Sequence, residues 1–368
     1  MRCRVGENPE IISKDYLSLY KNGHFFTKME NVSGVSSSST GRSADMYLKT
    51  DYFNETFGNG HIFFATGTPV TNSMTELYVM TRYLRPDLLK QSNTEFFDSW
   101  ASTFGKIVAR DDTGLDGKLQ VKTSFSKFTN LPELMATYKE FADIQSQEKL
   151  NLPRPELKSG KVQIVSVDAS PEQKRYIQEI AERAKAIQNG NPIPRANGKE
   201  DCYPVLTNEA KILGLGNRVI KTLYEKQNIP LPEDFVEDEY SKVDKCIDNV
   251  TEIYNRKNAE GNNKAVQIIF SDVAVNSDNG NFSAYQYIKE KLIEKGIPEN
   301  EIVFGPKSDA KDRADIFKKI NEGTYRVVIA STQTLGTGAN IQQNMYALHH
   351  LDIPWKPSDF ERAPVKVA

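Results

Sequence analysis

The sequence predicts an α/β fold in two lobes, with parallel sheets. Its 368 residues are 38% hydrophobic and 26% charged, which is enough apolar material for two ordinary cores. After residue 263, short apolar runs alternate with helical stretches that close with glycine. Strands that alternate with helices of this length require right-handed crossovers, and therefore indicate a parallel sheet.

The first part of the chain predicts one strand between two helices. Residues 33–47 include a serine-rich loop, and residues 44–58 have helix-like apolar spacing. Residues 61–65, "HIFFA", favour a short buried strand that runs into a turn. Ser73 and Glu76 have the spacing of a capping box, so a helix is expected from Ser73 until Pro86 stops it.

The middle of the chain is less regular. Residues 91–145 are rich in aromatic side chains, which predicts a small subdomain or insertion with Trp100 in its core, ending in a helix near residues 131–145. Residues 161–167, "KVQIVSV", alternate as a strand. Ser170, Pro171 and Gln173 then predict a capped helix that ends at Asn189-Gly190, followed by a linker with short helices up to residue 240.

The most regular pattern lies at the end of the chain. Strands are expected at residues 265–272, 301–305, 325–331 and 346–352, and helices at 283–296 and 312–323. Ligands of parallel sheets bind at the carboxyl ends of the strands. Two loops rich in glycine or hydroxyl groups follow predicted strands, at residues 65–69 ("ATGTP") and 332–342 ("TQTLGTGANIQ"). They are the candidate binding loops.

Composition excludes several functions. A net charge of −2 gives no overall basic field, so any contact with nucleic acid must be local. The three cysteines are far apart and contain no Cys-x-x-Cys pair, which argues against a zinc site or a disulfide framework. No apolar run approaches the ~20 residues that span a bilayer, so a cytoplasmic protein without membrane contact is expected. His349 and His350 face opposite sides of a strand, and no metal site is predicted.

Four segments, in order, resemble motifs of superfamily 2 helicases and Swi/Snf-type DNA translocases. They read "ATGTPVTNSMTELYVMTRYL", "IIFSD", "VVIASTQTLGTGANIQ" and "LDIPWKPSDFE". Further segments, such as "FTKMENVSG", "FDSWASTFG" and "FSKFTNLPELM", are similar to the large helicase-methyltransferase proteins of phages and bacterial mobile elements. The resemblance covers roughly residues 20–361 and implies two RecA-like lobes, the first incomplete and the second nearly complete.

The resemblance also implies roles for particular residues. In the first lobe, the motif that couples the nucleotide state to nucleic acid would be Thr66, Gly67, Thr68 and Pro69. In the second lobe, the residues that would contact DNA or nucleotide are Ser271, Asp272, Gln333, Gly336, Thr337, Gly338, Ala339 and Asn340. Small residues let backbone amides approach phosphate closely, which suits both loops to this role. A basic helix with Arg313, Lys318 and Lys319, preceded by Lys307 and Lys311, reads first as a solvated face.

The parts that hydrolyse ATP are missing from the sequence. An ATP motor needs Gly-x-x-x-x-Gly-Lys-Ser/Thr, an Asp-Glu pair for magnesium and an arginine finger. None of the Gly-Lys pairs fits the first motif, Tyr16 replaces the Glu expected after Asp15, and Arg362 is a poor substitute for the finger. ATP and Mg²⁺, the cofactors of the family, are therefore not expected to bind productively, and enzyme activity is uncertain.

The resemblance predicts a fragment of a helicase, truncated at both ends. Its parts would be the distal first lobe (1–90), a helical and aromatic insertion (91–160), the end of the first lobe with a linker (161–240), and a second lobe (241–368) truncated before the arginine-finger motif. Its partners would be DNA and the rest of the helicase or a methyltransferase domain. One alternative is a non-enzymatic remnant that binds DNA or a partner. The other, an α/β metabolic enzyme, lacks support because Gly-x-Gly-x-x-Gly and an acid/base cluster are absent.

Overall fold

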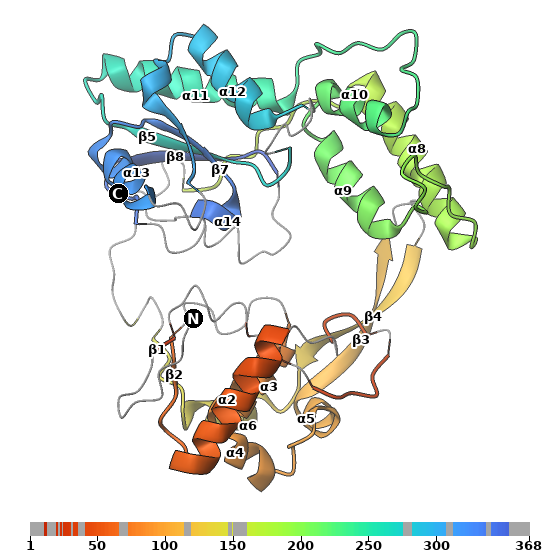
Figure 1. The fold of residues 1–368 in the computed structure, drawn as a ribbon, viewed down its shortest axis with the longest axis vertical. Helices are drawn as coiled ribbons and strands as arrows, with labels where there is room; N and C mark the ends of the chain where they lie inside the picture. The colour runs from red at the N-terminus through yellow and green to blue at the C-terminus, as the bar shows by residue number, and fades with distance from the viewer. Residues whose placement is uncertain are drawn as a thin grey trace. The chain divides into compact units, whose positions relative to one another are not determined.

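The computed structural model of the chain describes residues 11–12, 20, 23, 25–30, 32–35, 41–65, 73–113, 119–145, 149, 160–274, 282–306, 312–335 and 340–352. The chain forms two compact units, each with its own helices and strands (Figure 1). The first unit comprises Met1–Asp112 and Leu119–Leu152, and the second comprises Thr113–Lys118 and Pro153–Ala368.

The first unit is mainly helical among its described residues. A two-stranded parallel sheet joins β1 (Ile11–Ile12) to β2 (Phe63–Phe64), and a second two-stranded sheet joins β3 (Gly105–Thr113) to β4 (Leu119–Phe128). Its helices are α2 (Gly41–Phe57), α3 (Thr75–Leu84), α4 (Pro86–Gln91), α5 (Phe97–Phe104) and α6 (Leu131–Lys139).

An aromatic core holds the first unit together. The ring of Phe97 packs against those of Phe25 and Tyr78, with centroids 4.2 and 5.4 Å apart. Trp100 is 1% exposed in the same cluster, and Phe125 of β4 contacts both Phe97 and Trp100. Burial of large rings at these distances supplies most of the apolar stabilisation. The prediction that Trp100 is a core residue is confirmed.

The second unit contains a parallel four-stranded sheet in the order β6-β7-β5-β8. The strands are β5 (Val266–Phe270), β6 (Ile302–Phe304), β7 (Val327–Ala330) and β8 (Met345–His350). The other elements are α8 (Pro171–Gln188), α9 (Tyr203–Leu213), α10 (Asn217–Lys226), α11 (Lys242–Ala259), α12 (Ala284–Glu294), a 3₁₀ turn (Glu299–Glu301), α13 (Arg313–Glu322) and α14 (Thr332–Leu335).

Helices cover both faces of this sheet. Successive strand residues point to opposite faces, so Ile269 and Ile329 pack with α11 and α12, whereas Ile268 and Val328 pack with Ile320 of α13. Figure 1 shows α11 and α12 on one side of the sheet and α13 on the other. Every residue of β5 and β7 is buried. This layering confirms the predicted α/β fold, and it is compatible with a RecA-like lobe.

Helices α8, α9 and α10 pack into the core on the α11 side of the sheet. Ile180, Leu206 and Ile220, one from each helix, are fully buried in the same cluster as Ile247 of α11 and Ile269 of β5. Residues 171–226 therefore belong to the second compact unit. The expected division into a distal first lobe, an insertion, a linker region and a second lobe is not tested by this arrangement and stays a prediction.

Most predicted elements are confirmed, including α2, the helix that stops before Pro86, and every strand and helix expected after residue 263. The strand expected at 61–65 is present as β2, but it is not buried as predicted, because Phe63 is 52% exposed. Gly323 ends α13 in the left-handed region, with φ 76°, and a Cβ there would lie 2.8 Å from the backbone carbonyl oxygen of Lys264. Only glycine fits such a site without strain, which is why the glycine-closed pattern predicted this helix end well.

Three local predictions were wrong. Residues 161–169 form no strand in the structure, and Val162, Ile164 and Val165 are exposed. An alternating pattern becomes a strand only beside a hydrogen-bonded neighbour, and among the described residues this segment has no ladder partner. The expected Ser73 capping box is also absent, because the Ser73 hydroxyl accepts the N–H of Thr75 at 3.2 Å instead of that of Glu76, and the helix begins at Thr75. The helix expected to reach residue 145 ends at Lys139.

Candidate functional site

The candidate site lies at the carboxyl edge of the second unit's sheet, between β5 and β7. From β5 the chain continues to β6, beyond β7, whereas from β7 it continues to β8, beyond β5. The two connections therefore leave this point in opposite directions, and ligands of parallel sheets bind at such points. We refer to the carboxyl ends of β5 and β7 as the crevice, after the place that ligands take in such sheets. Ser271 and Asp272 follow β5, and Thr332 and Gln333 follow β7 at the start of α14.

A carboxylate joins the ends of these two strands. Asp272 accepts hydrogen bonds from the backbone N–H of Thr332 at 2.7 Å and from its hydroxyl at 2.6 Å. Charge-assisted bonds of this kind are the stronger ones in proteins. They fix the first residue of α14, the helix that precedes residues 336–339. In this structure Asp272 therefore positions the start of α14, and its contact with DNA or nucleotide stays a prediction.

Ser271 lies beneath the crevice. Its side chain is fully buried, and its hydroxyl donates to the carbonyl of Val273 at 3.0 Å. The hydroxyl of Tyr285 in α12 donates to the carbonyl of Ser271 at 2.9 Å. These bonds hold the segment after β5 in place. The predicted contact of Ser271 with a ligand is untested, and a burial of this degree favours a positioning role.

Asp352, directly after β8, organises the same segment. One of its carboxylate oxygens accepts the backbone N–H of Asp272 at 2.8 Å and that of Val273 at 3.2 Å, and lies 3.4 Å from the Ser271 hydroxyl. Its side chain is almost fully buried. The sequence contained Asp352 in the "LDIPW" segment, but the residue was not among the predicted site residues. Asp352 therefore connects the end of β8 to the segment that follows β5.

Two lysines complete this network. The Lys211 ammonium of α9 lies 3.8 Å from the second carboxylate oxygen of Asp352. Burial lowers the pKa of Lys242, at the start of α11; the charge of Asp352 opposes this shift and that of Lys211 adds to it. No local pattern indicated these lysines, because they come from segments far apart in the sequence. They place positive charge around a carboxylate that would otherwise be buried alone.

Asn340 is the predicted contact residue that the structure leaves open to solvent. Its side chain is exposed, while its carbonyl accepts a hydrogen bond of 2.7 Å from the Asn321 side chain in α13. Asn321 also accepts the Asn344 amide and the Gln343 N–H. The chain after the glycine-rich loop is thus anchored to α13, and the Asn340 side chain is free of that task.

Most of the remaining predicted site residues lie outside the part of the chain that the structure describes. Gly336, Thr337, Gly338 and Ala339 lie outside the described residues, and so do Thr66, Gly67, Thr68 and Pro69. Gln333 lies in α14. The elements on both sides of each loop are present: β2 and α3 flank the first, and α14 and Asn340 flank the second. Neither loop's role is tested by this arrangement.

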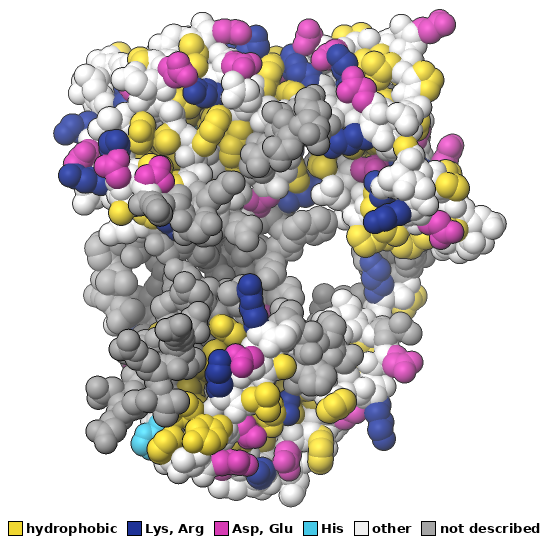
Figure 2. Space-filling model, in the orientation of Figure 1, with side chains coloured by type: hydrophobic (Ala, Val, Ile, Leu, Met, Phe, Trp, Pro, Cys, Tyr) yellow, Lys and Arg dark blue, Asp and Glu magenta, His cyan; other side chains and the backbone are white. Residues whose placement is uncertain are grey.

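The basic helix does not offer a bare cationic face. In α13, Lys319 pairs with Asp315 at 2.7 Å and Lys318 with Glu322 at 3.9 Å, while Arg313 donates to the carbonyl of Thr334. Figure 2 shows cations and carboxylates interspersed over the described surface on the face drawn. These pairs support the interpretation of the helix as an ordinary solvated face.

His349 and His350 contact different partners. Nε2 of His349 lies 3.1 Å from Oε1 of Gln267, whereas the His350 ring stacks on Phe270. Because the Gln267 amide nitrogen donates to the carbonyl of Val250, its oxygen faces His349, which therefore carries its proton on Nε2. Burial lowers the pKa of His349 to about 4, so the ring is neutral at physiological pH. Within the described part of the chain, no group of three or more His, Cys, Asp or Glu could hold a metal.

The α/β architecture, with strand connections that diverge between β5 and β7, is compatible with a RecA-like fold. Comparison with known families adds that residues 11–146 match the model of a family described as a probable helicase domain. The match covers the first unit and supports a helicase-related protein. A search of curated proteins returned no match. None of the helices in the described ranges has the length and apolarity needed to cross a membrane.

Proposed function

We propose that the chain is part of an ATP-dependent DNA helicase or translocase of the superfamily 2, Swi/Snf-like type. In this account, residues Thr66–Pro69 couple the nucleotide state to nucleic acid, and the loop from Gln333 to Asn340 contacts DNA. Two independent findings support it: the helicase match of residues 11–146, and a sheet whose carboxyl edge carries the second motif.

The observation that carries the proposal is the bond between Asp272 and Thr332. It joins the ends of β5 and β7 at the point where the strand connections diverge, directly before the glycine-rich loop. Small residues at positions 336–339 would let backbone amides approach a phosphate, and α14, directly before them, starts at this edge of the sheet.

We further propose that the chain does not hydrolyse ATP by itself. The sequence has no Gly-x-x-x-x-Gly-Lys-Ser/Thr motif, and Tyr16 stands where the family has the Glu that positions water. ATP and Mg²⁺ would be handled by the complete helicase. DNA, the rest of that helicase or a methyltransferase domain are the proposed partners, and the cytoplasm is the proposed compartment.

Two assays on the purified full-length chain test this function together. Fluorescence anisotropy with a short labelled DNA, at salt between about 50 and 200 mM, should show weak binding whose affinity falls steeply with salt. Hydrolysis of ATP with Mg²⁺, measured with and without DNA, should stay at background. Robust DNA-stimulated hydrolysis would contradict the claim that the phosphate-binding parts are absent, and salt-independent binding would contradict phosphate contact.

A further inference from the structure

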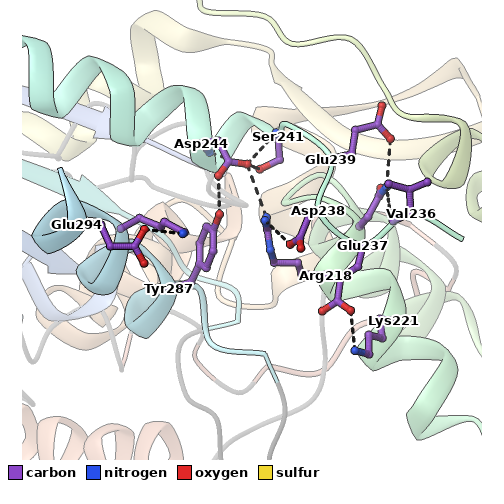
Figure 3. Close-up of polar contacts among 12 residues, drawn as sticks. Arg218, Lys221, Val236, Glu237, Asp238, Glu239, Ser241, Asp244, Tyr287 and Glu294 are labelled. Atoms are coloured by element: carbon purple, nitrogen blue, oxygen red, sulfur yellow. Dashed lines mark hydrogen bonds and ion pairs between the residues drawn. The ribbon is translucent and has the colours of Figure 1, made fainter.

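A strongly acidic segment covers basic side chains of the second unit. Residues 233–239, which we call the acidic strap, read "EDFVEDE" and contain five carboxylates in seven residues. The strap has no helix or strand and runs from the end of α10 toward the start of α11. Figure 3 shows Glu237 and Asp238 of the strap turned toward Lys221 and Arg218 of α10.

Three strap carboxylates pair with three cations on α8 and α10. Arg175 of α8 donates to both carboxylate oxygens of Asp234, at 3.1 and 2.8 Å. On α10, Lys221 donates to Glu237 at 2.6 Å and Arg218 to Asp238 at 2.8 Å (Figure 3). Arg218 and Lys221 are three residues apart, so they share one face of the helix.

The carboxylates of the strap are more exposed to solvent than the cations with which they pair. The side chain of Asp238 is 82% exposed and that of Asp234 is 73% exposed, whereas that of Arg218 is only 17% exposed. The side chains of Arg175 and Lys221 are 34% and 36% exposed, so the strap neutralises these cations and covers them only in part.

The strap is attached at Val236, and its last residue, Glu239, also accepts a hydrogen bond of 3.3 Å from Asn217. Asn217 donates to the carbonyl of Val236 at 2.7 Å, Glu172 accepts the Val236 N–H at 3.3 Å, and Phe235 packs partly against the core. The paired carboxylates on either side have exposed, salt-screened bonds, and such pairs contribute little stability. The acidic side chains can therefore leave their cations without loss of the anchor.

We propose that Arg175, Arg218 and Lys221 form a phosphate-binding row for nucleic acid, and that the acidic strap occupies this row until a strand displaces its carboxylates. Guanidinium groups bind carboxylate and phosphate oxygens with the same two-pronged geometry, so Asp234 on Arg175 occupies the place of a phosphate. The inference rests on the proposed DNA function, and it assigns a second contact surface away from the glycine-rich loop.

Neutralising the strap tests the proposal. The variant Asp234→Asn/Glu237→Gln/Asp238→Asn should bind single-stranded DNA about tenfold more tightly than the unaltered chain near 100 mM salt. The slope of log affinity against log salt should steepen by about two, because each added phosphate contact on a single strand contributes about 0.7. Fluorescence anisotropy of the full-length chain over a range of salt gives both quantities.

Two matched variants separate this mechanism from a simple change of net charge. Glu252→Gln/Glu290→Gln/Glu294→Gln removes the same charge from exposed, hydrogen-bonded carboxylates on α11 and α12, and should leave affinity within about twofold. Adding Arg175→Gln and Lys221→Gln to the neutral strap should abolish the gain; Arg218 is kept because it also contacts Asp244 and the Tyr287 ring.

Three results would overturn the proposal: no gain with the neutral strap, an equal gain in the control variant, or a gain that survives the loss of Arg175 and Lys221. The proposed DNA function is tested separately. DNA binding that does not depend on the glycine-rich loop would contradict that function.

Discussion

Asp352 shows how a single side chain can assemble the candidate site. Its carboxylate binds two backbone N–H groups after β5, while its own position is set by β8 and its charge is balanced by Lys211. These groups come from three segments of the chain that no local pattern connects. The sequence indicated Ser271 and Asp272 through their place after a strand, but the network that orients them depends on tertiary packing alone.

The first prediction concerns this carboxylate. Asp352→Ala should lower the free energy of unfolding of the chain by about 1–3 kcal/mol, because two buried N–H donors lose their acceptor and Lys211 loses its countercharge. Urea denaturation followed by far-UV circular dichroism measures the loss. Asp315→Ala, on the exposed face of α13, is the matched control and should cost less than about 0.5 kcal/mol. Equal costs for the two variants would contradict the assigned role.

The second prediction concerns pH. The pKa of His349 is lowered from 6.5 to about 4 by burial, so the unfolded chain binds this proton more strongly than the folded chain. The stability contributed by neutral His349 is therefore complete above pH 6.5 and is lost as pH falls toward 4, at up to about 1.4 kcal/mol per pH unit. Urea midpoints at several pH values should show this slope. His349→Gln should flatten it, and an unchanged slope in that variant would contradict the assignment.

At the scale of elements, the helices and strands that were predicted correctly are those marked by a local sequence pattern. Buried parallel strands are continuous apolar runs, as in β5 and β7, and glycine marks the end of α13, so this part of the fold could be predicted. The sheet of β3 and β4 was not foreseen, because two-stranded sheets bury little and leave a weak pattern. The strand prediction for residues 161–167 was wrong for the opposite reason. The alternating pattern is strong, but the segment has no hydrogen-bonded neighbour among the described strands.

The capping box of α8 gives a prediction at this scale. The Ser170 hydroxyl accepts the N–H of Gln173 at 3.0 Å, and it also donates to Asn217 at 2.6 Å. Ser170→Ala should therefore cost about 1–2 kcal/mol of stability, at the upper end for a cap. Thr207→Ala removes a hydroxyl that only bonds back within α9, and should cost less than about 0.5 kcal/mol in the same denaturation assay. A Ser170→Ala cost no larger than that of Thr207→Ala would show that the cap contributes nothing.

At the scale of the whole molecule, the two units contribute different support. The first unit carries the family match and the second carries the parallel sheet with its crevice. With a net charge of −2, the proposed nucleic-acid binding would depend on local groups, such as the cations that pair with the acidic strap. The fold of the second unit could be predicted from its alternating strands and helices. The strap's pairing could not, because it joins residues that are up to 59 positions apart.

The most direct measurement is the DNA affinity of Thr337→Ala/Asn340→Ala by fluorescence anisotropy. If the glycine-rich loop contacts phosphates, the affinity should fall about tenfold or more relative to the unaltered chain, and the salt dependence should become shallower. The control Thr207→Ala/Asn208→Ala removes the same two residue types from α9 and should bind DNA normally. A loop variant that binds DNA as tightly as this control would contradict the claim that the carboxyl edge of the sheet is the nucleic-acid interface.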